Sequence, residues 1–351
     1  MKTIIVTGGL GFIGSNFVIE WLERHNERVI NVDKLTYAGN LQNLVTLEDN
    51  LNHIFIHEDI SNNEVINELL QDYKPHSILN FAAETHVDRS IHSPEEFIRT
   101  NINGTFHLLE SIRKFWKDMA DKDSLRFLHV STDEVYGSLD LNEPAFTETH
   151  RYNPNSPYSA TKAASDHLIR AYHRTYGIPV LTTNCSNNYG PFQFPEKLIP
   201  LTIHNALTDK EIPIYGNGQQ IRDWLYVSDH CNAIRCVLEA GQVGEMYNIG
   251  GYNEMTNLEV VNTICSILDE VKPREDGGSY KSQIKFVKDR LGHDKRYAIN
   301  ATKIEKNLNW HPSETLETGI KKTIQWYLDH QDWVTNITNK DYQTWVAKHY
   351  T

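Results

Sequence analysis

Tyr158 and Lys162 are the residues whose types and spacing most clearly indicate chemistry. Four positions apart on an expected helix, their side chains lie on one face, one turn from each other. The lysine ammonium favours the phenolate and lowers the pKa of Tyr158, which can then take a proton from a sugar hydroxyl. The same lysine can hold a nicotinamide ribose. The pair predicts oxidation of an alcohol, although a surface Tyr and Lys on an amphipathic helix give the same pattern.

A second pair, Asp133 and Glu134, offers an acid and a base that alcohol oxidation does not need. It follows Ser131 and Thr132 at the end of an expected strand, where ligands bind in parallel α/β sheets. Adjacent carboxyl groups raise each other's apparent pKa, so one can stay protonated near neutrality. A base for a carbon-bound proton and an acid for a departing hydroxyl indicate an elimination coupled to the oxidation. A structural role for the pair is equally open from the residues alone.

A glycine-rich turn between the first expected strand and helix indicates a dinucleotide site; it spans residues 7–15. Gly8, Gly11 and Gly14 allow a tight turn, close approach to a pyrophosphate, and close packing of helix on strand. The helix N-terminus adds free N–H groups and a positive dipole end. Glycine-rich turns also occur in folds that bind no dinucleotide, but the strand-to-helix context favours one here.

Asp33, at the end of the second expected strand, indicates NAD rather than NADP. Its carboxylate can accept hydrogen bonds from ribose hydroxyls and would repel a 2′-phosphate, an argument that the neighbouring Lys34 weakens. The ends of the third and fourth strands add weaker candidates for the same cofactor, Asp59, Ile60, Ala82 and Ala83.

Three cations lie in otherwise near-neutral or acidic segments and could converge on a diphosphate: Lys197, Arg222 and Arg290. Arg222 precedes Asp223, so an ion pair between these two neighbours is the alternative. His293 and Tyr297 follow at short spacing and are expected in the same pocket, although a lone histidine is more often structural.

Runs of β-branched residues alternate with segments of 3.6-residue periodicity in the first half of the chain. Strands are expected at residues 3–7, 28–33, 53–57, 77–80, 126–131 and 180–184, and helices at 12–24, 65–73, 97–117 and 159–176. The alternation predicts an α/β fold with a Rossmann-type doubly wound parallel sheet and a smaller mixed α/β substrate-binding domain.

The expected domain organisation has three parts. Residues 1–190 form the NAD-binding domain, with later segments interleaved, and residues 191–330 form the sugar-nucleotide-binding domain. Residues 331–351 form a tail whose aromatic residues predict a docked helix: Trp333, Tyr342, Trp345 and Tyr350. Residues 272–282 contain one proline and two glycines and are expected to form an exposed loop.

The composition is that of an ordinary soluble globular protein, with 351 residues, 39% of them hydrophobic and 23% charged. The net charge of −12 argues against a nucleic-acid or membrane partner. The four cysteines form no Cys-x-x-Cys pair, so reduced thiols and no metal site are expected. The chain shows no signal peptide and no apolar run of membrane-spanning length, so a cytoplasmic location is expected.

Together these segments resemble the extended short-chain dehydrogenase/reductase superfamily, and within it the nucleotide-sugar 4,6-dehydratases. The resemblance runs from residue 1 to about residue 330 and includes residues 7–15, 33–40, 82–90, 131–137, 158–162, 184–191, 194–200, 222–227 and 290–297. The Thr132-Asp133-Glu134 triplet distinguishes the 4,6-dehydratases from related epimerases, which keep the glycines and the Tyr-x-x-x-Lys pair but lack this triplet. Thr85 and Thr161 stand where the family usually has serine, and both keep a hydroxyl.

The resemblance implies conversion of dTDP-glucose to dTDP-4-keto-6-deoxyglucose and water, a step of deoxysugar biosynthesis. Tyr158 would be the base for oxidation at carbon 4, with Thr132 hydrogen-bonded to that oxygen. Glu134 would remove the carbon 5 proton while Asp133 protonates the departing carbon 6 hydroxyl. Hydride would then return to carbon 6, so NAD is tightly bound and recycled.

The resemblance also assigns binding residues. The NAD side would be lined by Gly8, Gly11, Phe12, Ile13, Gly14, Asp33, Lys34, Leu35, Thr36, Asp59, Ile60, Ala82, Ala83, Thr100, Tyr158, Lys162 and Asn188. The substrate side would be lined by Thr85, Thr132, Asn187, Lys197, Leu198, Pro213, Tyr215, Arg222, Asn257, Arg290, His293 and Tyr297.

Members of the superfamily usually form homodimers through a four-helix bundle, which here would use the helices at residues 97–117 and 159–176. Their apolar positions extend beyond one face, in agreement with a second buried surface. Two rival functions are a sugar-nucleotide 4-epimerase, which does not need Asp133 and Glu134, and a catalytically silent NAD-binding sensor.

Overall fold

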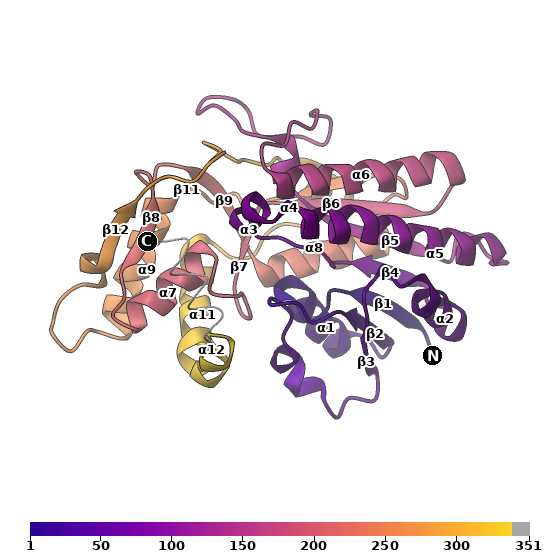
Figure 1. Cartoon of the computed structure of the whole chain (residues 1–351), viewed down its shortest axis with the longest axis horizontal. Coiled ribbons are helices and arrows are strands. Elements are labelled where there is room, and N and C mark those ends of the chain that lie inside the picture. The colour runs from indigo at the N-terminus through magenta and orange to yellow at the C-terminus, as the bar shows by residue number, and fades with distance from the viewer. Residues whose placement is uncertain (339–351) are drawn as a thin grey trace.

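A seven-stranded parallel sheet forms the centre of the larger part of the molecule (Figure 1). The computed structural model describes residues 1–338. Neighbouring strands follow the order β10-β6-β5-β4-β1-β2-β3, and every pairing is parallel. The strands are β1 (Thr3–Thr7), β2 (Arg28–Asp33), β3 (His53–His57), β4 (Ser77–Asn80), β5 (Arg126–Thr132), β6 (Val180–Cys185) and β10 (Met246–Ile249). The strand order reverses between β1 and β4, so a crevice opens at their carboxyl ends.

Successive residues of each strand enter two hydrophobic clusters, one on each face of the sheet. In β1, for example, Ile4 and Val6 belong to one cluster and Ile5 to the other. The first face is covered by α1 (Phe12–Arg24), α8 (Val227–Ala240) and α10 (Thr302–Leu308). The second is covered by α2 (Asn63–Tyr73), α5 (Thr105–Asp118) and α6 (Pro157–Tyr176). Burial of both faces explains the near-continuous apolar strands of the sequence.

Helix α6 starts two residues earlier than the apolar pattern predicts because its cap lies before that pattern. Ser156 and Ser159 form a reciprocal capping box, and Pro157 occupies the first turn. Gly177, with φ +80°, ends the helix in the left-handed conformation that glycine adopts without strain. Helix α2 likewise begins early, because the Asn62 side chain accepts a hydrogen bond from the Val65 N–H at 3.4 Å.

The single helix expected at residues 97–117 is instead three successive segments. These are α4 (Pro94–Phe97), a π-helical segment η2 (Ile98–Gly104), and α5. Apolar periodicity does not report the width of a turn, so the sequence hides the change in winding. Strands β5 and β6 each run one residue beyond their expected ends, to Thr132 and Cys185.

The smaller part of the molecule contains two small sheets around its own hydrophobic cluster. One sheet joins β7 (Asn187–Tyr189), β9 (Ile221–Tyr226) and β11 (Glu254–Thr256), and the other pairs β8 (Ile212–Tyr215) with β12 (Ile284–Val287). Helices α7 (Leu198–Leu207), α9 (Asn257–Val271) and α11 (Leu316–Asp329) complete the cluster. Short helical turns lie at α3 (Val87–His92), η1 (Leu41–Leu47), η3 (Asp133–Tyr136) and η4 (Tyr280–Gln283). The loop expected at residues 272–282 therefore ends in a helical turn, which the Ser279 side chain caps.

The chain passes between the two parts more than once. After β7 and β9 it returns to the large sheet, where α8 packs on α1 and β10 extends the sheet beside β6. After β12 it returns again, because α10 contacts both β10 and α8.

A short helix, α12 (Gln331–Ile337), closes the described part of the chain. Its Trp333 is buried and donates a hydrogen bond from Nε1 to Asn43 Oδ1 at 2.7 Å. The docked helix expected over residues 331–351 can be followed only this far, because Tyr342, Trp345 and Tyr350 lie outside the described residues.

Among residues 1–338, no helix has the length and apolar character that a membrane crossing requires. Within the same range, no cluster of three or more His, Cys, Asp or Glu side chains is arranged to hold a metal ion. The four cysteines carry free thiols, and all but Cys236 are buried.

Candidate active site

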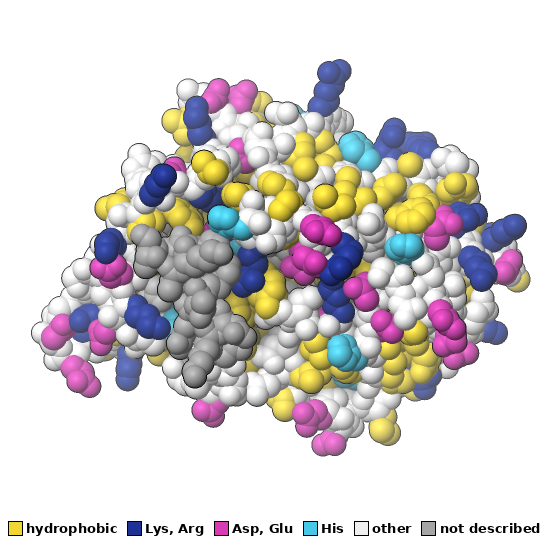
Figure 2. All heavy atoms as spheres, viewed as in Figure 1, with side chains coloured by type: hydrophobic (Ala, Val, Ile, Leu, Met, Phe, Trp, Pro, Cys, Tyr) yellow, Lys and Arg dark blue, Asp and Glu magenta, His cyan; other side chains and the backbone are white. Residues whose placement is uncertain are grey.

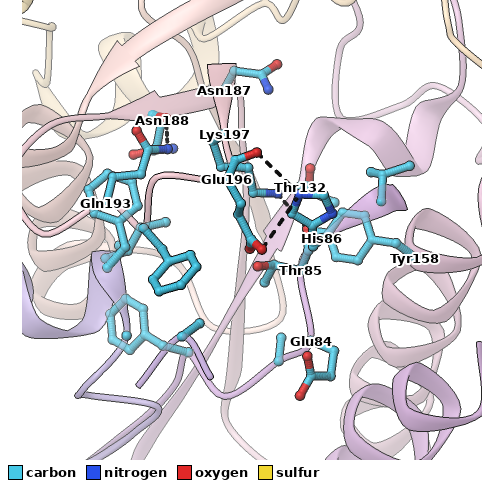
Figure 3. A pocket seen from close by; sticks show the side chains of 18 of the residues that line it. Glu84, Thr85, His86, Thr132, Tyr158, Asn187, Asn188, Gln193, Glu196 and Lys197 are labelled. Carbon is cyan, nitrogen blue, oxygen red and sulfur yellow. Dashed lines mark hydrogen bonds and ion pairs between the residues drawn. The ribbon is translucent and has the colours of Figure 1, made fainter. Parts of the chain in front are cut away.

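A cavity of about 370 Å³ lies at the carboxyl ends of the large sheet and extends to the smaller part of the molecule. Figure 3 shows residues of both parts around it, including Thr132 and Tyr158 from the sheet side and Lys197 from the segment before α7. The cavity wall brings together every expected binding and catalytic residue except Leu35 and Asp133. Leu35 does not line the cavity and packs against the hydrophobic cluster that includes residues of β1 and α1, and its contact with NAD stays a prediction.

The glycine turn leaves space that side chains would fill. Gly8 has φ +71°, and a Cβ atom there would lie 2.6 Å from the Ala82 nitrogen. A Cβ on Gly14 would lie 2.2 Å from the Gly8 carbonyl oxygen. Helix α1 follows without a side-chain cap, because its N-cap residue is Gly11. The free N–H groups at this end of the helix therefore lie in the cavity wall, as a phosphate site requires.

Asp33 and Lys34 are oriented by their neighbours. The Asp33 carboxylate accepts hydrogen bonds from the Leu10 N–H at 3.0 Å and from the Leu35 N–H at 2.9 Å. Lys34 Nζ donates to Thr100 Oγ1 at 2.8 Å and lies 3.5 Å from Asp59 Oδ2. Since Lys34 is engaged by Asp59, it does little to offset the repulsion that Asp33 exerts on a 2′-phosphate.

Tyr158 and Lys162 lie on one face of α6, but their electrostatics differ from the expectation. Tyr158 is 7% exposed and packs edge-on against Phe97. Burial and the nearby Glu134 raise the pKa of Tyr158 well above its ordinary value. The Lys162 ammonium donates to the Val130 carbonyl at 2.8 Å, and burial lowers the pKa of Lys162. The expected lowering of the tyrosine pKa is therefore wrong, because burial and the nearby negative charge of Glu134 have the largest effects on it.

Asp133 and Glu134 begin the helical turn η3, which Thr132 caps by accepting from the Glu134 N–H at 3.3 Å. Asp133 is 1% exposed, and its Oδ2 atom has no hydrogen-bond partner among the described residues. Burial and the charge of Glu134 raise the pKa of Asp133 well above its ordinary value. Burial also raises the pKa of Glu134, but Arg290, Lys197 and Arg222 oppose that shift. The two carboxyl groups are therefore differentiated, with Asp133 the more readily protonated.

The three expected cations converge on the cavity. Arg222 lies with its guanidinium 4.3 Å from the Tyr297 ring centre and donates to the Asp294 carbonyl at 3.0 Å. The alternative ion pair with Asp223 is not formed, because Asp223 accepts from the Gly251 and Asn253 N–H groups. Neighbouring residues of β9 point to opposite sides, so Arg222 and Asp223 face different surroundings. His293 lies beside the cation Arg290 and hydrogen-bonds Asp289 Oδ1 at 2.6 Å.

Three residues that the sequence did not single out connect the two parts around this cavity. Asp88 contacts Arg290 Nη1 at 3.5 Å and accepts from the Tyr215 hydroxyl at 3.3 Å. Glu196 accepts from the Tyr37 hydroxyl at 3.0 Å and from Arg89 Nε at 3.2 Å. His86 faces both the carbonyl and the carboxylate of Glu196, as Figure 3 shows. These residues lie in motifs that the resemblance covers, but only the fold shows that Asp88 and Glu196 meet partners more than 100 residues away.

The comparisons with known proteins agree with this geometry. Residues 5–323 match the family model described as GDP-mannose 4,6 dehydratase. The chain is 58% identical over 345 residues to dTDP-glucose 4,6-dehydratase of Xanthomonas campestris pv. campestris (strain B100), covering 98% of each chain. The solved dTDP-glucose 4,6-dehydratase from Bacillus anthracis in complex with NAD is 45% identical, with TM-score 0.85, covering 96% of this chain and 100% of that one. The enzyme DesIV from Streptomyces venezuelae, solved with NAD bound, is 41% identical, with TM-score 0.86 over 95% and 98% of the two chains.

Proposed function

The chain belongs to the nucleotide-sugar 4,6-dehydratase family, and within it to the dTDP-glucose 4,6-dehydratases, and from this premise we propose how its residues carry out the reaction. The enzyme is a lyase that converts dTDP-glucose to dTDP-4-keto-6-deoxyglucose and water. The observation that carries the mechanism is the differentiated carboxyl pair Asp133 and Glu134 beside Tyr158, which a 4-epimerase does not need.

NAD fits the residues present. Gly8 and Gly14 leave room that a Cβ atom would fill, and the uncapped end of α1 offers N–H groups for its diphosphate. Asp33 lies at the end of β2, where it can accept from the adenosine ribose hydroxyls. When bound, NAD accepts hydride from carbon 4 of the sugar and returns it to carbon 6, so it is recycled.

Tyr158 takes the proton of the carbon 4 hydroxyl, and Thr132 hydrogen-bonds the same oxygen. The pKa of Tyr158 is raised by burial in the protein alone, so a positive charge nearby is required to make it an effective base. Lys162, one turn along the same helix face, supplies such a charge.

Glu134 removes the carbon 5 proton, and Asp133 protonates the hydroxyl that leaves carbon 6. Glu134 then returns its proton to carbon 5 when hydride is delivered to carbon 6. This assignment rests on their surroundings, since Arg290, Lys197 and Arg222 favour ionised Glu134, whereas burial and the Glu134 charge outweigh Arg222 at Asp133 and favour its protonated form. The same three cations, Lys197, Arg222 and Arg290, also hold the diphosphate of the substrate.

We further propose that the enzyme is a homodimer formed through α5 and α6. Figure 2 shows hydrophobic side chains gathered over α6 and the start of α5. Two large apolar side chains of this stretch are exposed, Ile98 of η2 at 47% and Phe106 of α5 at 41%. A second copy of the same surface would bury these side chains, as a two-fold four-helix contact requires.

The decisive test is mass spectrometry of dTDP-glucose after incubation with the purified protein and no added cofactor. Loss of one water without net formation of reduced cofactor is the expected result. An unchanged mass, accompanied by formation of the galactose epimer, would instead identify a 4-epimerase and leave Asp133 and Glu134 with a structural role.

A further inference from the structure

A row of buried polar side chains crosses the large sheet beneath the active site. Thr7 of β1 is paired in register with Asn80 of β4, and Asn80 is paired with His129 of β5. All three side chains are at most 1% exposed. They lie on the face of the sheet that α5 and α6 cover, because their alternate neighbours Ile5, Ile78 and Phe127 belong to that cluster. Polar groups so deeply buried need defined partners.

The hydrogen bonds of this row fix the histidine tautomer. Thr7 Oγ1 donates to Asn80 Oδ1 at 2.7 Å, so the Asn80 amide nitrogen points the other way, 3.1 Å from His129 Nδ1. An amide nitrogen can only donate, so Nδ1 accepts and the ring proton of neutral His129 is on Nε2. Burial and Lys162 lower the pKa of His129 well below its ordinary value, which keeps the ring neutral.

His129 Nε2 faces two charged groups on α6. It lies 3.5 Å from Asp166 Oδ1 and 3.5 Å from Lys162 Nζ. An Nε2–H group is attracted to the carboxylate and cannot accept from the ammonium, which instead donates to the Val130 carbonyl. Asp166 Oδ1 has no hydrogen-bond partner among the described residues, and His129 Nε2 at 3.5 Å is its polar neighbour on the sheet.

Asp166 is one helical turn beyond Lys162, which is one turn beyond Tyr158, so the three share one face of α6. Its Oδ2 atom accepts from the hydroxyls of Ser131 and Tyr152, each at 2.9 Å. Burial raises the pKa of Asp166 to about 6, which still leaves a carboxylate at neutral pH.

The other described side chains that lie near Lys162 and Asp166 are uncharged at neutral pH. Asn184 of β6 and Tyr136 of η3 lie near Asp166, and the Cys185 thiol lies near Lys162. Asp166 is therefore the counter-charge that favours the protonated form of Lys162 and opposes the lowering of its pKa by burial.

We propose that Asp166, oriented by the Thr7–Asn80–His129 row, is a positioning residue that keeps Lys162 protonated and thereby sets the charge that Tyr158 experiences during proton transfer. The role in proton transfer rests on the proposed function, but the effect on Lys162 does not. No direct contact of Asp166 with substrate or cofactor is needed.

The first test measures Lys162 itself in the protein as purified with its bound cofactor. Lysines are labelled with ¹³C at Cε, the resonance of Lys162 is assigned by its loss in Lys162→Met, and its shift is followed with pH. Asp166→Asn is expected to lower the measured pKa of Lys162 by at least about one pH unit. The matched control is Ser165→Ala, next to Asp166 on α6. It removes a buried hydroxyl that donates a hydrogen bond to the Asn101 carbonyl, and it changes no charge, so the titration of Lys162 should be unaltered.

A milder variant covers the case in which Asp166→Asn does not fold. Tyr152→Phe removes one hydrogen bond from the Asp166 carboxylate, which weakens its charged form, and is expected to shift the Lys162 titration in the same direction by a smaller amount. An unchanged titration in whichever of the two variants folds would overturn the proposal.

A second readout separates this inference from the proposed function. Single-turnover oxidation of dTDP-glucose is followed as a function of pH, and the alkaline limb of the profile is expected at lower pH in Asp166→Asn, with Asp166→Glu restoring it. A variant that is slower by the same factor at every pH would show a merely structural role. If the wild-type protein does not oxidise dTDP-glucose at all, the proposed function fails while the lysine titration still decides the role of Asp166.

Discussion

Asp133 and Glu134 are neighbours in the sequence, yet the protein surrounds their carboxyl groups differently. At the buried Asp133, desolvation and the charges of Glu134 and Asp223 outweigh Arg222, whereas Glu134 borders the cavity opposite three cations. A protonated acid beside an ionised base is the condition that an elimination needs. A single turn of helix, η3, is enough to place the two groups in these two environments.

The double variant Asp133→Asn, Glu134→Gln is expected to carry out the first hydride transfer and then stop. Tyr158 and Lys162 are untouched, so carbon 4 is still oxidised, but no group removes the carbon 5 proton. Reduced cofactor should accumulate to about one equivalent per site, visible in its absorbance, while dehydration falls by at least about 100-fold. Asp118→Asn, Asp123→Asn likewise replaces two carboxyl groups by amides, at exposed positions, and should behave as wild type. Dehydration at the native rate by the first variant would contradict the assigned roles.

Gly8 and Gly11 have different reasons to be glycine, which stability measurements can separate. A methyl group on Gly8 would collide with the Ala82 backbone and would require a left-handed φ, whereas one on Gly11 would only approach the Gly8 carbonyl to 3.4 Å. Gly8→Ala is expected to lower the free energy of unfolding by about 2 kcal/mol or more. Gly11→Ala should stay within about 1 kcal/mol of wild type. Urea unfolding of both variants checks this order, and equal losses would refute it.

The residues that could be identified from the sequence are those whose chemistry is local. The glycine turn, the Tyr158–Lys162 spacing and the adjacent carboxyl groups each fall within a few positions of one another. Asp88 and Glu196 could not be assigned from the sequence, because their partners are brought to them by the fold. The lowered tyrosine pKa was predicted wrongly because spacing reports a neighbouring charge but not the desolvation that opposes it.

At the scale of elements, the short helix α3 is the point where both parts of the molecule meet. Its Asp88 contacts Arg290 and Tyr215 from the substrate side, and its Arg89 pairs with Glu196 before α7. The Arg89 guanidinium also lies 3.7 Å from the centre of the Tyr37 ring, which belongs to the loop after β2. One turn of helix therefore ties the cofactor loop to the segment that carries Lys197.

This tie is expected to be sensitive to pH. Burial raises the pKa of Glu196 from its ordinary value of 4.5 to about 6, so the folded protein holds that proton more tightly than the unfolded chain. Its contribution to stability is complete below about pH 4.5 and is lost as the pH rises through about 6. Glu196→Gln remains neutral, so relative to wild type it should gain about 2 kcal/mol across this interval.

Urea unfolding of wild type and Glu196→Gln at several pH values measures this difference. The exposed Glu270→Gln in the same half of the chain serves as the control and should show no comparable trend. A difference between wild type and Glu196→Gln that stays constant from pH 4.5 to 7 would mean that folding does not raise the pKa of Glu196.

Strands and most helices could be predicted because alternation and caps are local signals. The η2 segment could not, because a π-helical turn and an α-helical turn bury similar residues. The expected domain boundary after residue 190 could not be placed sharply from the sequence for a different reason. Strand β10 belongs to the large sheet because it pairs with β6, and its sequence neighbours do not indicate this.

At the scale of the whole molecule, the proposed dimer makes its own prediction. Phe106→Glu places a charge on the exposed apolar surface at the start of α5 and is expected to convert the dimer to monomer at micromolar concentration. Phe286 on β12 is 55% exposed on the smaller part of the molecule, so Phe286→Glu is the matched control and should stay dimeric. Sedimentation velocity distinguishes the two states, and a Phe106→Glu protein that sediments like wild type would place the interface elsewhere.

The repeated passage of the chain between its two parts limits how this enzyme can be recombined with its relatives. Because α8, β10 and α10 return to the large sheet after the substrate side has begun, a single splice near residue 190 would bring a foreign strand and two foreign helices into the NAD-binding core. A chimera that exchanges nucleotide-sugar preference must therefore transplant separate segments and leave the host's own α8, β10 and α10 in place. Changes of substrate are more accessible to scattered point substitutions in this architecture than to the shuffling of contiguous modules.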